Sequence, residues 1–171
     1  MATFVLTVIG DDRPGLVSAV SGPISAHGAS WERSQLGRLA GKFAGIVLVS
    51  VPHERADALV EELQGLEAQG LHLTVERTDE PTRTDVRQLT LELLGIDRPG
   101  IVAEVSAALA AHGVSIEELS TDVRDAPMAG GTLFEAKAVL VAPQSAKDDQ
   151  LRAQLEDIAD ELMVEITLTD E

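Results

Sequence analysis

The feature that most constrains this chain is a repeat within it. Residues 6–30 read LTVIGDDRPGLVSAVSGPISAHGAS, residues 91–115 read LELLGIDRPGIVAEVSAALAAHGVS, and the two segments align without a gap at an offset of 85. Such self-similarity indicates that one structural unit occurs twice. A chain of 171 residues is long enough for two small domains. We therefore expect a first domain over 1–79, a linker over 80–87 and a second domain over 88–171.

The same order of elements is predicted in both halves. A short apolar run indicates a buried strand, an amphipathic stretch indicates a helix, and two further strands, a second helix and a last strand follow. The order βαββαβ predicts an α+β fold of two tandem ferredoxin-like domains, each an antiparallel four-stranded sheet with both helices on one face. The predicted strands are 3–9, 29–39, 46–51, 71–76, 89–94, 114–124, 133–141 and 164–169, and the predicted helices are 16–27, 54–67, 101–112 and 146–161.

Local patterns add detail to the predicted helices. Gly28 and Gly113 follow the first helix of each half, where a left-handed residue commonly ends a helix. Ser145 followed by Asp148 resembles a capping box at the start of the last helix. We expect glycine-containing turns over 37–45 and 125–131. The residues predicted to face the core are Leu16, Val17, Val20 and Ile24 and their counterparts Ile101, Val102, Val105 and Leu109.

Charge and composition exclude several classes of function. The formal net charge is −16, so direct binding to nucleic acid or to an anionic membrane is not expected. The sequence contains no cysteine, which removes disulfides and thiolate chemistry. The chain also has no apolar run near the roughly 18 residues that a membrane helix needs, and no basic segment followed by an apolar one at its start. We expect a cytoplasmic protein.

The segments Asp12–Gly15 and Asp97–Gly100, both with the sequence DRPG, join the first strand to the first helix of each half. The first N–H groups of a helix are unpaired and lie at the positive end of its dipole, so a ligand carboxylate is stabilised there. A glycine at this point lets a ligand approach the backbone closely. A structural explanation is also open: a tight turn needs Pro and Gly, Asp12 or Asp97 can cap the helix, and the arginines can point to solvent.

The pattern G-x-D-R-P-G-[LI]-V-x-x-V-S…A-H-G-x-S resembles the opening of an ACT domain, a βαββαβ module that senses amino acids. The resemblance covers the whole chain twice, with no catalytic domain attached, as in stand-alone tandem ACT regulators. It implies that a ligand lies at an interface between two domains. The commoner family pattern has Asn just after the helix-ending Gly, where this chain has Ala29-Ser30 and Val114-Ser115. The predicted ligand-binding residues are Asp12, Arg13, Pro14, Gly15, Ser30, Asp97, Arg98, Pro99, Gly100 and Ser115.

No catalytic or metal site is predicted. Asp12 and His27 lie at opposite ends of a helix of about 12 residues, which separates them by about 18 Å. We interpret His27 and His112 as residues of the last helical turn, favoured there by the helix dipole. Ser21 and Ser106 lie on helices without a partner histidine, and no pair of histidines has the spacing of metal ligands. We expect no cofactor.

Two hypotheses for function follow. The first is a stand-alone regulator that binds an amino acid such as glycine or serine, or a similar zwitterion or carboxylate, and controls a partner protein in transcription or metabolism. The alternative is a ligand-free module that only pairs chains or holds an enzyme. In both cases we expect a homodimer, because four-stranded sheets of this kind leave edges that pairing satisfies.

Overall fold

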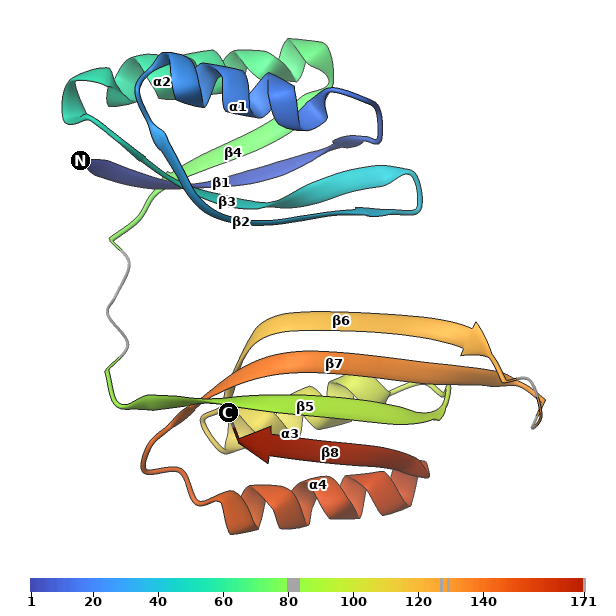
Figure 1. Cartoon of the computed structure of the whole chain (residues 1–171). Coiled ribbons are helices and arrows are strands. Elements are labelled where there is room, and N and C mark those ends of the chain that lie inside the picture. The colour runs from blue at the N-terminus through green and yellow to red at the C-terminus, as the bar shows by residue number, and fades with distance from the viewer. Residues whose placement is uncertain (80–83, 127, 129, 171) are drawn as a thin grey trace. The chain divides into compact units, whose positions relative to one another are not determined.

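The chain forms two compact units, Met1–Pro81 and Thr82–Glu171. The computed structural model describes residues 1–79, 84–126, 128 and 130–170. Each unit contains one four-stranded antiparallel sheet, with the order β2-β3-β1-β4 in the first unit and β6-β7-β5-β8 in the second. The two helices of each unit cover the same face of its sheet (Figure 1). The predicted ferredoxin-like fold is confirmed in both halves.

The elements of the first unit are β1 (Ala2–Asp11), α1 (Leu16–Ala26), β2 (Ser30–Leu39), β3 (Lys42–Val51), the short 3-10 helix η1 (His53–Arg55), α2 (Ala56–Gln64), η2 (Gly65–Gln69) and β4 (Leu71–Arg77). Those of the second unit are β5 (Val86–Ile96), α3 (Ile101–Ala111), β6 (Ser115–Asp125), β7 (Thr132–Pro143), α4 (Asp148–Leu162) and β8 (Val164–Asp170). Strand β5 thus begins inside the segment 80–87 that the sequence predicts as linker.

The core of each unit is aliphatic and lies between the sheet and its helices. Fully buried leucines from both layers meet there, for example Leu6 and Leu63 in the first unit and Leu89 and Leu109 in the second. The strands alternate between this face and the opposite one, so Leu6 and Val8 of β1 are buried while Thr7 and Ile9 are exposed. Among the described residues, no helix is long and apolar enough to cross a membrane.

The predicted ends of α1 and α3 are confirmed. Gly28 and Gly113 have φ of 69° and 71°, the left-handed region that glycine adopts without strain. In the first unit the N–H of Gly28 donates to the carbonyl of Ser25 and the N–H of Ala29 donates to that of Ile24. This pair of bonds is a Schellman motif, and the second unit repeats it.

Several local predictions are wrong. The predicted helix 54–67 is an α-helix flanked by two 3-10 segments, η1 and η2. The predicted turn 37–45 contains only two residues, Ala40 and Gly41, which both have positive φ, as a tight hairpin requires. Helix α4 begins at Asp148, with Lys147 at its N-cap and no side-chain cap bond, so Ser145 forms no capping box. The N–H of Ala146 donates to the carbonyl of Pro143 instead.

The apolar face of the first helix is narrower than predicted. Val17 and Val102 are 46% and 43% exposed, although their neighbours Leu16 and Ile101 are buried. A residue one position along a helix lies about 100° around its axis. The sheet covers one side of the helix only, so these two valines point past its edge.

Candidate ligand-binding loops

A backbone hydrogen bond joins each DRPG loop to a hairpin of its sheet, the β2–β3 hairpin in the first unit and the β6–β7 hairpin in the second. The N–H of Asp12 donates to the carbonyl of Gly41 at 3.0 Å, and the N–H of Asp97 donates to the carbonyl of Thr132 at 2.8 Å. Both acceptors lie where the hairpin enters its second strand. The position of the hairpin therefore sets the position of the loop, and with it the point where the helix starts.

Gly15 and Gly100 have φ of 89° and 95° and form the N-caps of α1 and α3. A Cβ atom built on either glycine meets no other atom within 4 Å. The space in front of the backbone is therefore open in both units, and the left-handed conformation explains why glycine stands there. Neither helix start has a side-chain cap hydrogen bond, so Asp12 and Asp97 do not cap their helices.

The charged residues of the first loop have partners. Arg38 donates from Nη1 to Oδ2 of Asp12 at 3.1 Å. Arg13 donates from Nη2 to the carbonyl of Gln69 at 2.5 Å, which joins the loop to the end of η2. Arg38 lies on β2 and Gln69 in η2, so the first loop is tied to β2 and η2 as well as to the hairpin.

The second loop lacks both of these contacts. The position of Arg38 in the sheet is taken by Val123, because Arg38 pairs with Phe43 in the same register in which Val123 pairs with Phe134. Asp97 and Arg98 form no side-chain hydrogen bond or ion pair within the described part of the chain. The carboxylate of Asp97 is therefore the more accessible of the two to a ligand ammonium group.

Next to the first loop, Asp11 forms an ion pair with Lys42 on the neighbouring strand β3. The hydrogen bond from Lys42 and its positive charge hold the pKa of Asp11 below its ordinary value of 3.8. Both side chains are exposed, at 81% for Asp11 and 62% for Lys42. The pair makes the end of the β1–β3 ladder polar but does not enclose a site.

The structure does not bring Ser30 and Ser115 near the loop of their own unit. Ser30 pairs with Ser50, which pairs with Thr3 at the start of β1. The loop follows the other end of β1, at Asp11, eight residues away or about 26 Å along an extended strand. Ser115 has the equivalent place, since it pairs with Val141 beside Gln88. Within one unit, Ser30 and Ser115 therefore lie at the end of the sheet opposite the DRPG loop.

The recurrent histidines and serines have structural contacts. His27 Nε2 lies 2.5 Å from Oε2 of Glu62, and His112 Nε2 lies 2.7 Å from Oε1 of Gln154, so each histidine links the two helices of its unit. Ser106 donates from its helix to the carbonyl of Ala103. Over the described residues, no group of three or more His, Asp or Glu side chains could hold a metal ion.

An apolar edge lies between the first helix of each unit and the edge strand of its sheet. In the second unit it exposes Val102, Ile116 and Leu119, at 43%, 38% and 48%. Beneath these side chains is an apolar cavity of about 30 Å³, against about 10 Å³ in the first unit. Trp31, which stands where the second unit has Ile116, lines the smaller cavity and donates to Ser34.

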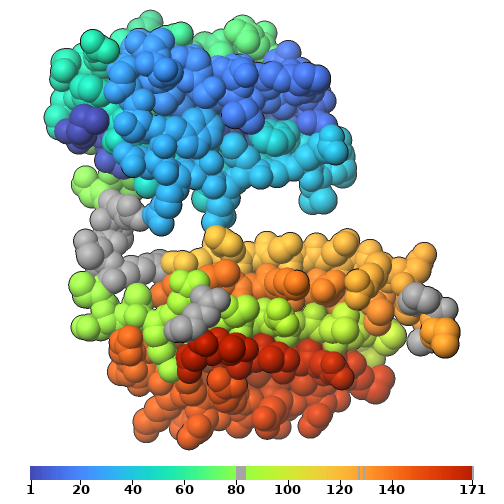
Figure 2. All heavy atoms as spheres, in the orientation of Figure 1, coloured from blue at the N-terminus to red at the C-terminus, as the bar shows by residue number. Residues whose placement is uncertain are grey.

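Every residue of β6 is exposed, and in Figure 2 its atoms, in yellow and orange, lie along the surface of the second unit. The sequence prediction missed this edge, because it placed Val102 in the core. The sequence of β6 contained a clue: Ile116, Leu119 and Val123 are its only apolar residues, and polar or charged residues surround them.

Comparison with known proteins places this fold and these loops in a family. The ACT domain matches twice, over residues 2–76 and over residues 89–160. The chain belongs to the ACT-domain family and consists of two such domains in tandem.

Within that family, the glycine cleavage system transcriptional repressor of Escherichia coli (strain K12) is 27% identical over 145 residues, 83% of this chain and 76% of the repressor. The resemblance of the sequence to the repressor group of tandem ACT proteins is thus confirmed. A protein of unknown function from Galdieria sulphuraria is 32% identical, with a TM-score of 0.85, over 99% of this chain and 98% of its own. The crystal structure of a candidate glycine cleavage system transcriptional repressor has a TM-score of 0.73 at 18% identity, covering 99% and 97%, which supports the fold alone.

Proposed function

We propose that this chain is a stand-alone regulatory protein that binds an amino acid such as glycine or serine at its DRPG loops and thereby controls a partner protein. The observation that carries the proposal is the open backbone in front of Gly15 and Gly100, at the start of equivalent helices in two ACT domains. A helix start of this kind stabilises a carboxylate without a basic side chain. The free carboxylate of Asp97 makes the second loop the better acceptor for the ammonium group.

The exposure of both loops supports a site completed by a second domain. Asp97, Pro99 and Gly100 are all exposed within their own unit, so one unit alone encloses little of a bound amino acid. A neighbouring domain that contributes its serine, Ser30 or Ser115, would close the site. Ligand binding would then stabilise one arrangement of domains over another, which is the basis of allosteric control.

The controlled partner is proposed to be a protein rather than nucleic acid. The half of the chain up to Asp85 has 7 basic and 12 acidic residues, and the rest has 6 and 17. Neither half would attract a phosphate backbone. The relationship to a transcriptional repressor supports a partner in transcription, and an amino-acid enzyme is the other candidate. We also propose that the chain is not an enzyme, since His27 and His112 are engaged between helices and far from the loops.

A second candidate function is a ligand-free assembly module. The exposed apolar edge formed by Val102, Ile116 and Leu119 favours it, because such an edge can pair chains whether or not a ligand binds. If the chain is instead the amino-acid-binding regulator proposed above, the same edge could pair two copies of it into a homodimer. The two functions differ in whether the loops bind anything.

Thermal unfolding of the full chain in the presence of each common amino acid at millimolar concentration separates them. A ligand at about 100 times its Kd adds roughly 2.7 kcal/mol, a rise of several degrees in Tm. We expect glycine or serine to raise Tm, and Gly15→Val or Gly100→Val to abolish that rise relative to the variant's own Tm without ligand. Gly22→Ala, an open glycine inside α1, is the matched control. A flat response to every amino acid would favour the assembly module.

A further inference from the structure

The first unit has a surface hollow at the end opposite its DRPG loop. It lies where β1 starts, β4 ends and α2 starts, and its volume is about 530 Å³, within the range of small-molecule sites. Its apolar lining consists of Ala2, Phe4, Ala56 and Val60, and its polar lining of His53, Asp57, Glu61, Gln64 and Arg77.

The second unit allows an internal comparison, because the same place can be located there by register. Arg77 pairs with Phe4 as Asp170 pairs with Leu89, and Ala2 pairs with Val51 as Arg87 pairs with Ala142. The histidine contacts to Glu62 and Gln154 align α2 with α4. By this alignment the residues Arg87, Asp148, Arg152 and Asp170 stand where the first unit has Ala2, Ala56, Val60 and Arg77.

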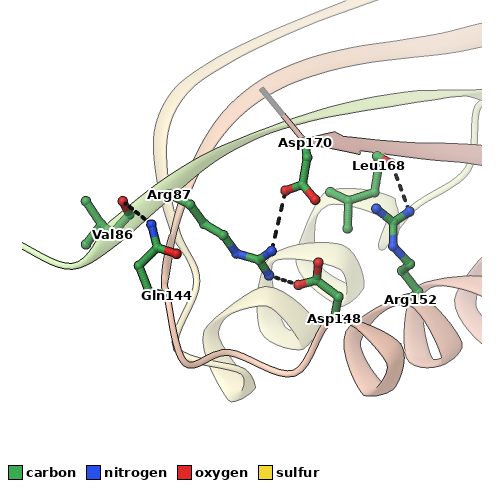
Figure 3. A network of polar contacts seen from close by, with 7 residues as sticks. All are labelled: Val86, Arg87, Gln144, Asp148, Arg152, Leu168 and Asp170. Atoms are coloured by element: carbon green, nitrogen blue, oxygen red, sulfur yellow. Dashed lines mark hydrogen bonds and ion pairs between the residues drawn. The ribbon is translucent and has the colours of Figure 1, made fainter.

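Charged side chains fill this place in the second unit (Figure 3). The guanidinium of Arg87 contacts the carboxylate of Asp148, and its Nη1 lies 3.5 Å from Oδ1 of Asp170. Arg152 donates to the carbonyl of Leu168 at 2.8 Å. A cation from β5 thus lies between two carboxylates.

The first unit lacks these side chains and has the opposite charge at one position. Ala2 and Ala56 cannot reach across the space that Arg87 and Asp148 occupy, which leaves the hollow. Arg77 stands in place of Asp170, and it forms no side-chain hydrogen bond or ion pair with the described residues. An unpaired guanidinium therefore borders an empty space that holds a cation in the other unit.

We propose that this hollow is a second small-molecule site, which takes a zwitterion with an apolar body. The carboxylate of the ligand pairs with Arg77, whose planar guanidinium suits that group. The ammonium faces Asp57 and Glu61, which are one helical turn apart on the same side of α2. The apolar body lies on Phe4 and Val60. The site is independent of the DRPG loops.

The test uses L-leucine as the zwitterion, and leucinamide and 4-methylpentanoate as analogues that lack its carboxylate and its amine. An NMR titration of the full chain with L-leucine is expected to shift the amide signals of residues 53–64 and 77 to saturation, with weaker binding of both analogues. Arg77→Gln should weaken L-leucine about tenfold or more, as the loss of a charged hydrogen bond does, and leave leucinamide unchanged. Arg55→Gln, an exposed arginine outside the hollow, is the matched control.

A filled variant, Ala2→Arg with Ala56→Asp and Arg77→Asp, rebuilds the cluster of the second unit and should abolish the shifts. If this variant does not fold, Arg77→Gln with the two analogues still decides. Shifts confined to other residues, or L-leucine binding that survives Arg77→Gln, would overturn the proposal. Amino-acid binding lost in Gly15→Val and Gly100→Val but kept in the filled variant would support the loop site and refute this one. Binding kept in the two glycine variants but lost in the filled variant would support the hollow and refute the loop site.

Discussion

The guanidinium of Arg87 at the start of β5 contacts the carboxylate of Asp148 at the start of α4, and each side chain is only 22% exposed. The two residues are 61 positions apart in the sequence, so the pair joins the first strand of the second unit to its last helix. Removing one partner of such a pair leaves a partly buried charge without compensation.

Asp148→Ala is therefore expected to destabilise the second unit by about 1–3 kcal/mol, less than for a fully buried pair. The measurement is native-state hydrogen exchange of the β5 and α4 amides in the full chain. Asp149→Ala is the control, because it removes an exposed acidic residue from the same helical turn. Equal losses in the two variants would mean that the helix dipole, and not Arg87, accounts for the effect of Asp148.

The ion pair between Asp11 and Lys42 predicts a pH effect. Because the pKa of Asp11 is lowered in the folded chain, its contribution to stability is present above the ordinary value of 3.8 and is lost as pH falls through the folded value. Lys42→Met should return the pKa of Asp11 toward 3.8, as followed by a ¹³C NMR titration of its carboxyl. Lys137→Met, on a strand of the other unit, should not change it; an Asp11 titration unaffected by Lys42→Met would show that the pair does not persist in solution.

Two glycines, one just after α1 and one inside it, should respond to alanine in opposite directions. Gly28 has a φ of 69°, and a Cβ there would lie 2.9 Å from Nη1 of Arg55, so Gly28→Ala should cost about 1 kcal/mol. Gly22 lies inside the helix with open space around it, and Gly22→Ala should stabilise by up to about 1 kcal/mol. Chemical denaturation of both variants gives the comparison, and the same sign for both would contradict this account of the Schellman motif.

The apolar edge of the second unit predicts how copies of the chain associate. Leu119→Lys places a charge on the exposed edge strand β6 and should convert the proposed homodimer into monomer in sedimentation experiments, with Tm of the monomer little changed. Ile46→Lys, which alters a 50% exposed residue of β3, is the control. A monomer from Ile46→Lys and a dimer from Leu119→Lys would place the interface elsewhere.

The prediction from sequence succeeded where information is local or repeated. The alternation of apolar residues in β1 and the helix-ending glycines each act over a few residues, and their recurrence after 85 positions made the order of elements clear. It failed for Val17 and Val102, since the apolar stripe of a helix does not show how far the sheet extends beneath it. The sequence alone also did not show that Ser30 lies at the end of the sheet opposite the loop of its own unit, because helix α1 carries the chain back along the sheet.

The sequence by itself determined two copies of a βαββαβ unit, their aliphatic cores and the two DRPG turns, because hydrophobic spacing and glycine conformations are read along the chain. Only the tertiary structure decided which charges meet. Arg87, Asp148 and Asp170 come from three separate elements, and so do Ala2, Ala56 and Arg77. Sheet register together with the packing of a helix on the sheet brings each set together. The same arrangement of the backbone gives an ion-pair cluster in one unit and a hollow in the other. The reason is that the size and the charge of these side chains have an effect only once folding has made them neighbours.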